Sequence, residues 1–94
     1  MIEVTFNKNL LVVKNHAKDR LVCCAVSTIM YTCTAWFKKN EIVFFEDPTN
    51  TIIAIELKKK TKTSLVKLAM AFSQIQLLQK QYPKDIKVKA TKSK

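Results

Sequence analysis

One uncharged stretch constrains the fold of this chain more than any other feature. Seventeen consecutive residues, from Leu21 to Phe37, carry no charge, and they contain all three cysteines of the 94-residue chain. A β-strand usually has about 3–10 residues, so this length predicts a helix that is buried on most sides. Asp19 is well placed to be its N-cap, which puts Cys23 in the first helical turn.

The same stretch reaches only the lower end of the length that spans a membrane. Four serine and threonine side chains dilute its apolar character, and a lone span would leave a basic, patterned remainder without a fold. A helix buried in a soluble domain is therefore the better prediction, with no membrane partner. No signal-peptide pattern opens the chain, and three cysteines are an odd number, so we expect a reducing cytoplasm and no disulfide framework.

The pattern of the remaining residues predicts short strands and one further helix. Alternating and β-branched residues predict strands over 2–6, 10–14, 41–46, 51–57 and 86–89. Asn7-Lys8-Asn9 predicts a turn with left-handed residues in a chain without glycine, and Asp47-Pro48-Thr49-Asn50 predicts a second turn. We expect Lys38 and Lys39 to close the first helix. Thr63 or Ser64 is the expected N-cap of the second helix, and Pro83 is expected to end it.

The predicted order is β-β-α-β-β-α-β, in a single domain over residues 1–94 with a lysine-rich tail at about 84–94. Two hairpins and two helices predict an α+β fold, in which both helices pack on one face of a mostly antiparallel sheet. The first helix has apolar side chains around most of its circumference, more than one sheet covers, so we expect a homodimer. These side chains are Leu21, Val22, Val26, Ile29, Met30 and Trp36.

The charge is unevenly distributed along the chain. Residues 1–57 hold six basic and six acidic side chains, whereas residues 58–94 hold eleven lysines and a single acid, Asp85. The net charge of +10 therefore lies in the second segment. This pattern is typical of attraction to an anionic partner such as RNA or the ribosome, and equally of a lysine-rich surface that keeps a small protein soluble.

The three cysteines and the only histidine could serve either as metal ligands or as a nucleophile with its base. Zinc binding by His16, Cys23, Cys24 and Cys33 fits poorly, because adjacent cysteines on a helix point about 100° apart and no C-x-x-C spacing is present. We expect no metal site. A nucleophile fits better, since His16 could act as its base and the helix start favours a thiolate at Cys23. From these residues alone, a core cysteine and a loop histidine remain the simpler interpretation.

The segment V-C-C-A-V-S, preceded by H-A and a nearby aspartate, resembles the signature of the bacterial ribosomal-processing cysteine proteases, the Prp family. That family shows a G-H-A-G loop and then D-x-V-C-A-A-V-S on a small dimeric α+β domain, with the same order of elements. By motif position, the resemblance implies that Cys23 is the nucleophile and His16 its base. Ser27 matches the helical serine of the family. Asp19 is the other residue that would support them, although it lies four residues before Cys23 in place of three and Arg20 occupies the family's aspartate position. No cofactor is implied.

The resemblance also implies a substrate, the precursor of large-subunit ribosomal protein twenty-seven, which loses an N-terminal extension during ribosome assembly. We expect free backbone N–H groups at the helix start to hold the oxyanion. The chain departs from the family pattern where Asn15 and Lys18 replace glycines and Cys24 replaces alanine. The alternative function is that of a catalytically inactive relative that binds ribosomes or RNA through its lysine-rich C-terminal half.

Overall fold

The computed structural model describes residues 1–90, so the end of the predicted lysine-rich tail lies outside the described residues. The order of elements is β-β-α-β-β-α-β, which confirms the prediction. Five strands and two helices make up this part of the chain: β1 (Ile2–Asn7), β2 (Leu10–Lys14), α1 (Arg20–Ala35), β3 (Ile42–Asp47), β4 (Ile52–Leu57), α2 (Lys62–Gln81) and β5 (Ile86–Ala90).

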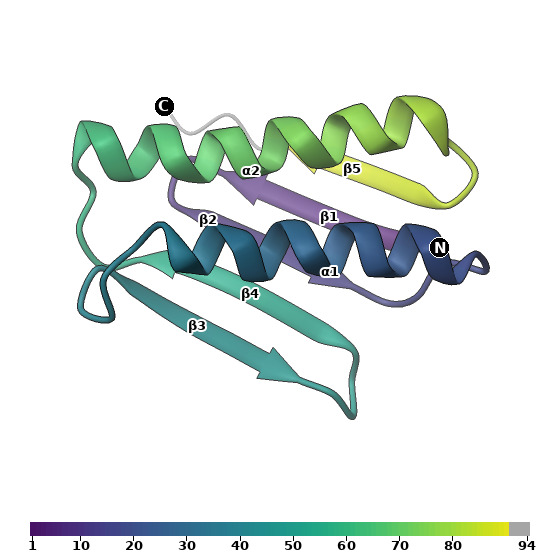
Figure 1. Cartoon of the computed structure of the whole chain (residues 1–94), viewed down its shortest axis with the longest axis horizontal. Helices are drawn as coiled ribbons and strands as arrows, with labels where there is room; N and C mark the ends of the chain where they lie inside the picture. The colour runs from purple at the N-terminus through teal and green to yellow at the C-terminus, as the bar shows by residue number, and fades with distance from the viewer. Residues whose placement is uncertain (91–94) are drawn as a thin grey trace.

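The strands form one sheet in the order β3-β4-β2-β1-β5, with both helices on the same face of it (Figure 1). Three of the four strand pairs are antiparallel, and only β5 runs parallel to its neighbour β1. The predicted α+β class and the mostly antiparallel sheet are confirmed. Among residues 1–90, neither helix combines the length and the apolar character needed to cross a bilayer.

The core lies between the sheet and the two helices. Alternate residues of each strand point to this layer, because successive side chains of a strand face opposite sides. The most deeply buried strand residues are Ile2, Val4, Leu11, Ile55 and Ile86. α1 contributes Val22, Val26, Met30 and Cys33, and α2 contributes Leu68, Ala71, Phe72 and Ile75.

The start of α1 confirms the predicted cap, but its end does not match the prediction. The side chain of Asp19 accepts a hydrogen bond from the backbone N–H of Leu21 at 2.9 Å. The helix ends at Ala35, and its last turn holds no basic residue. The cation at this end comes from the neighbouring helix, because the ammonium group of Lys67 donates to the carbonyl oxygen of Trp36 at 2.7 Å.

The apolar circumference of α1 is better covered than the sequence indicated. Three of the six apolar residues lie in the core, and Ile29 and Trp36 pack against it while partly buried. Only Leu21 is strongly exposed, at 75%. The reason is that α2 packs beside α1 and covers a second side of it (Figure 1). The α1 surface therefore gives no support for the predicted homodimer.

Two local predictions are wrong in detail. Thr61 is the N-cap of α2, in place of Thr63 or Ser64, and its hydroxyl accepts the N–H of Ser64 at 3.1 Å. Ser64 is buried under this cap, so its own side chain points inward. The first turn uses no left-handed residue. Instead, the side-chain oxygen of Asn7 accepts the N–H of Asn9 at 3.1 Å.

Candidate active site

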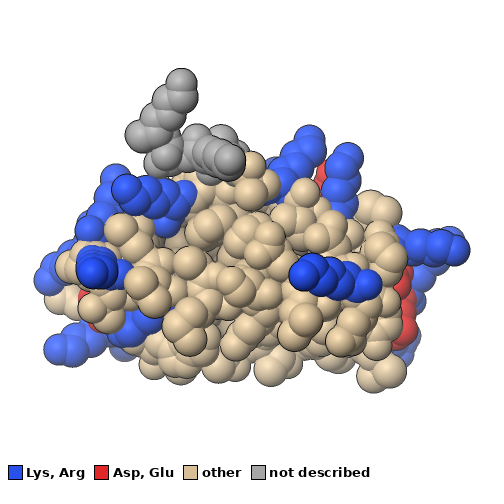
Figure 2. Space-filling model, turned by 90° about the horizontal axis from the view of Figure 1, so that it is seen from above, with Lys and Arg blue, Asp and Glu red and all other residues tan. Residues whose placement is uncertain are grey.

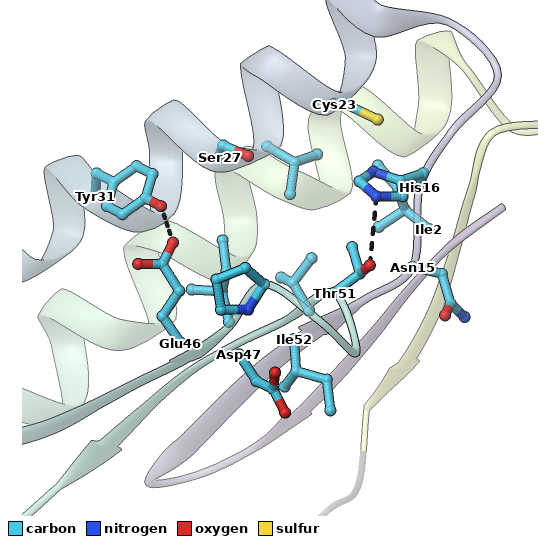
Figure 3. A pocket seen from close by; sticks show the side chains of 14 residues that line it. Ile2, Asn15, His16, Cys23, Ser27, Tyr31, Glu46, Asp47, Thr51 and Ile52 are labelled. Carbon is cyan, nitrogen blue, oxygen red and sulfur yellow. Dashed lines mark hydrogen bonds between the residues drawn. The ribbon is translucent and has the colours of Figure 1, made fainter.

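A pocket of about 250 Å³ opens at the end of the molecule where α1 begins (Figure 3). Its walls come from α1 between Cys23 and Tyr31, the start of β1, the end of β2 with the loop after it, and the β3–β4 hairpin. His16, Cys23 and Ser27 all line it. Three of the four predicted site residues therefore meet in one cavity. The fourth, Asp19, is the cap of α1 and is not among the lining residues.

The loop before α1 folds back over the first turn of the helix. The backbone N–H of Ala17 points at the sulfur of Cys23, with the nitrogen 3.1 Å from Sγ. The thiol in turn faces the carbonyl oxygen of Ala17 at 3.6 Å. This pair of contacts fixes the sulfur against the loop and brings His16, the residue before Ala17, to the same pocket. A thiolate can accept a hydrogen bond from an N–H group that points at the sulfur.

A residue that sequence reasoning missed holds the imidazole of His16. The hydroxyl oxygen of Thr51 lies 3.3 Å from Nε2 of His16, in a contact whose donor depends on the ring tautomer. In Figure 3 the ring is seen between this hydroxyl group and the sulfur of Cys23. A nucleophile, a base and a third group that orients the base form the usual arrangement of covalent catalysis. Thr51 is 35 residues from His16, so no local pattern indicates the contact.

Two residues beside the pocket have left-handed backbone, Asn15 with φ of 71° and Thr51 with φ of 55°. Asparagine adopts this conformation more readily than most residues, so Asn15 can replace the glycine of the family loop. Its side-chain amide also donates to the carboxylate of Glu3 at 2.8 Å. A β-branched residue such as Thr51 is a clear outlier in this region, and such strain often occurs at functional sites.

The expectation of free N–H groups at the helix start is wrong. Asp19 takes up three of them. Its carboxylate accepts the N–H of Leu21, and its carbonyl oxygen accepts those of Val22 at 3.1 Å and Cys23 at 3.3 Å. The N–H of Ala17, which already points at the sulfur, is the described donor nearest the nucleophile. It comes from the loop and not from the helix.

The three cysteines differ sharply in their surroundings. Cys23 is half-buried and lines the pocket, whereas Cys24 is exposed and is not among the lining residues. Cys33 is fully buried in the core, and this loss of solvation raises the pKa of its thiol to about 11, against a smaller opposing effect from the charge of Lys67. Cys23 is therefore the one cysteine of the three that lines the pocket. In residues 1–90, no three His, Cys, Asp or Glu side chains gather as a metal site would require.

Two acidic residues of the β3–β4 hairpin, Glu46 and Asp47, also line the pocket. The hydroxyl group of Tyr31 donates to the carboxylate of Glu46, and this hydrogen bond, together with partial desolvation and the charge of Glu46, raises the pKa of Tyr31. Beside them, Asp47 accepts from the side chain and the backbone of Asn50, which lowers the pKa of Asp47. These bonds fix the β3–β4 turn that leads into Thr51.

A cysteine and a histidine in one pocket, with the cysteine at the start of a helix on this sheet, are the arrangement expected of a small α+β cysteine protease. No model of a known protein family matches the chain. It is 33% identical over 92 residues to the ribosomal processing cysteine protease Prp of Mycoplasma genitalium, which covers 92% of each chain. Against Prp of Mycoplasma pneumoniae, it is 31% identical over 91 residues, 92% of this chain and 91% of the relative.

The chain belongs to the ribosomal processing cysteine protease Prp family. Its fold matches a crystal structure of Prp from S. aureus in complex with a covalently linked product peptide, with a TM-score of 0.83. The match covers 97% of this chain and 100% of the other at 15% identity, so it concerns the fold alone. The family resemblance inferred from V-C-C-A-V-S is thereby confirmed.

Proposed function

We propose that this protein is a cysteine endopeptidase that removes an N-terminal extension from a ribosomal protein precursor, with large-subunit protein twenty-seven as the substrate. The observation that carries the proposal is the shared pocket of His16 and Cys23, which the fold of the loop over α1 brings about. The names of the relatives, ribosomal processing cysteine proteases, support the substrate class. The cytoplasm, where ribosomes assemble, is the proposed location.

The residues of the pocket suit a two-step hydrolysis. His16 takes the proton of the Cys23 thiol, and the thiolate attacks the scissile carbonyl carbon. The C–N bond then breaks, the leaving amine takes the proton from His16, and a thioester remains. Water, deprotonated by His16, attacks the thioester and releases the carboxylate product, and the thiol regains its proton.

Other groups of the site have supporting roles in this scheme. The N–H of Ala17 can pass from the sulfur to the oxyanion, since an oxygen bound to the attacked carbon lies close to the sulfur. Thr51 keeps the imidazole in place through Nε2. Ser27 lies one turn beyond Cys23 in the pocket wall, where its hydroxyl group can bond to the peptide. Asp19 acts indirectly, by capping the helix that carries the nucleophile.

The test compares four single variants on a precursor peptide that contains the extension. Cys23→Ala and His16→Ala should abolish cleavage, while Cys24→Ala should cleave at close to the wild-type rate because its side chain is exposed outside the pocket. Cys33→Ala should lose stability and keep activity while it is folded. Iodoacetamide labelling, followed by mass spectrometry, reports in parallel which sulfur reacts.

Two results would contradict the proposal. Cleavage by Cys23→Ala together with its loss in Cys24→Ala would assign the reaction to the other sulfur. A wild-type protein that neither labels at Cys23 at neutral pH nor cleaves any precursor, but binds ribosomes, would favour the alternative of an inactive binding relative.

We propose also that the protein is a homodimer, through α2 and not through α1. Residues 68–79 of α2 carry no charge, and Val66, Met70 and Leu77 expose apolar side chains at helical spacing along it. Figure 2 shows a broad uncharged area between the two charged ends of the molecule. Two copies that each carry a charge of +10 repel one another, so an uncharged face is where they can meet.

Light scattering after size exclusion tests the dimer. The wild-type protein should have twice the chain mass of 10.8 kDa, and Met70→Glu should be monomeric. Leu21→Glu is the control on α1, where an apolar residue that is even more exposed than Met70 should tolerate the charge. A monomeric wild-type protein at micromolar concentration would exclude this assembly.

A further inference from the structure

Seven lysines from separate parts of the chain come together at the end of the molecule opposite the pocket. We call this surface the lysine end; it consists of Lys8, Lys38, Lys39, Lys58, Lys59, Lys60 and Lys62. All seven side chains are exposed. Figure 2 shows the gathering of basic side chains at the left end, which is where α1 ends and α2 begins in Figure 1.

Backbone hydrogen bonds join the three loops that carry these lysines. The N–H of Lys58, after β4, donates to the carbonyl oxygen of Glu41, in the loop before β3, at 2.8 Å. The N–H of Leu57 donates to the carbonyl oxygen of Asn9, in the β1–β2 turn, at 2.9 Å. The loops are therefore held beside one another by the sheet, and the cluster of charge is built into the fold.

The sequence suggested that the C-terminal half as a whole attracts an anionic partner. The basic cluster at the lysine end is composed differently. Three of its seven lysines come from residues 1–57, which are neutral in total. Lys80 lies in the last turn of α2 and Lys84 just after the helix, close to Asp85 and to the pocket end. The fold thus places described lysines of the second half at both ends of the molecule and adds basic residues of the first half to one of them.

A groove with aromatic walls opens beside these lysines. Its lining residues are Thr34, Phe37, Lys38, Lys39, Ile42 and Phe44, around a volume of about 340 Å³. Phe44 is 39% exposed, and its ring contacts Tyr31 on one side, with 6.0 Å between centroids. Phe37 is half-buried beneath the ammonium group of Lys67, which lies 5.1 Å from the ring centroid.

We propose that the lysine end is a docking surface for a single-stranded segment of RNA, whose phosphates contact the lysines and one of whose bases enters the groove against Phe44. Proteins that bind single-stranded nucleic acid combine a basic surface with aromatic rings on which bases stack. The two features lie side by side here, since Lys38 and Lys39 belong to both.

An anionic membrane fits this surface less well. Peripheral binding to a bilayer relies on apolar side chains that insert beside the basic ones. The loop segments Lys38-Lys39-Asn40 and Lys58-Lys59-Lys60-Thr61 contain only polar and charged residues. A base, in contrast, needs only the partly exposed ring of Phe44.

This inference deepens the proposed function, since an RNA contact suits a protease that works on ribosomal particles, but its test does not depend on catalysis. Binding of a fluorescent single-stranded oligouridylate is measured by anisotropy over a series of salt concentrations. The quadruple variant Lys38→Ala/Lys39→Ala/Lys59→Ala/Lys60→Ala removes four charges of the lysine end. The matched control, Lys14→Ala/Lys80→Ala/Lys84→Ala/Lys87→Ala, has the same net charge and leaves that surface intact.

We expect the first variant to bind at least about tenfold more weakly and to reduce the slope of log affinity against log salt by about 2–3, since each phosphate contact contributes about 0.7 for a single strand. The control variant should change both values much less. Phe44→Ala should weaken binding by about fivefold or more through the loss of stacking. Phe45→Ala, its neighbour on the opposite face of β3, is the matched control and should bind like the wild type.

Several outcomes would overturn the proposal. Equal weakening by the two quadruple variants would reduce the effect to net charge. Binding to vesicles of phosphatidylserine and phosphatidylcholine without binding to the oligonucleotide would assign the surface to a membrane. Absence of any binding would leave the lysines as a solubilising surface.

Two controls separate this test from that of the proposed function. Thermal melting by circular dichroism shows that each variant is folded. Cleavage of a short precursor peptide should be unchanged in the first quadruple variant, because the pocket lies at the other end. Lost cleavage in the wild type with retained RNA binding would contradict the protease alone.

Discussion

The backbone N–H of Asn15 donates a hydrogen bond to the carbonyl oxygen of Thr51 at 3.0 Å, and both residues have left-handed backbone. They are the only residues with positive φ in the described part of the chain, which contains no glycine. The bond connects the loop that carries His16 to the β3–β4 turn. The hydroxyl group of Thr51 then reaches Nε2 of His16. The strained pair thus sets the distance between the base and the group that orients it.

Thr51→Val should lower kcat/KM on the precursor peptide by about fivefold, because a side-chain hydrogen bond contributes about 1 kcal/mol. The change keeps the β-branched shape and removes only the hydroxyl group that faces His16. Thr51→Ser should restore most of the activity. A shift in the pH profile of kcat/KM in the valine variant, absent in the serine variant, distinguishes positioning of His16 from a loss of packing. Equal activity in all three proteins would contradict this role.

Thr51→Gly should raise the free energy of unfolding by about 1 kcal/mol, even though it removes the same hydroxyl group. Left-handed backbone costs a non-glycine residue about 1–2 kcal/mol, and a threonine most of all, while glycine adopts it freely. Urea unfolding measures the change. Activity should fall as in the valine variant. A glycine variant less stable than the wild type would mean that φ of 55° at Thr51 is not strained.

The burial of Cys33 should make the free energy of unfolding fall at alkaline pH. Its folded-state pKa, raised to about 11 by burial, exceeds the unfolded value, so its contribution is complete at neutral pH and is lost as the pH rises from about 9 to 11. The loss should be about 1–2 kcal/mol, allowing for solvent screening. In Cys33→Val this loss should be absent when unfolding is measured at several pH values. Iodoacetamide at neutral pH should leave Cys33 unlabelled until the protein is unfolded.

Glu46→Gln should lower the pKa of Tyr31. The hydrogen bond to the Glu46 carboxylate is the largest cause of the raised pKa, and the negative charge of Glu46 adds to it. Titration by the ultraviolet absorbance of the phenolate measures the shift. Tyr82→Phe serves as the background, so that Tyr31 is the only tyrosine observed. An unchanged titration curve would show that the two side chains are apart in solution.

Features that depend on neighbouring residues could be predicted from the sequence. The cap by Asp19, the order of elements and the alternation of β5 follow from local patterns, and the structure confirms them. The motif around Cys23 identified the family. Features made by distant residues could not be predicted. Lys67 at the end of α1 comes from another helix, and the burial of Ile29 and Trp36 depends on the core that distant elements build.

The residues of the site fall into the same two groups, those placed by local sequence and those placed by distant residues. His16, Cys23 and Ser27 are close in sequence, and they line one pocket as the motif indicated. Thr51 and Glu46 reach that pocket from the β3–β4 hairpin, so their positions depend on the register of the sheet. The oxyanion expectation failed for a different reason. A helix start has free N–H groups only until its cap takes them, and here Asp19 uses both its side chain and its backbone.

The distance between the pocket and the lysine end has a consequence for the choice of substrate. The molecule extends 35 Å along its longest axis, and the two surfaces occupy its opposite ends. Cys23 lies twelve residues before the end of α1 at Ala35, which is about 18 Å along the helix axis. A protease anchored to RNA by its lysines would hold its nucleophile at about this distance from that surface. An extended peptide covers about 3.3 Å per residue, so about six residues of free chain are needed to reach from the particle to Cys23. The fold would then select substrates by length, so that long, unstructured extensions are cleaved and short ones are not.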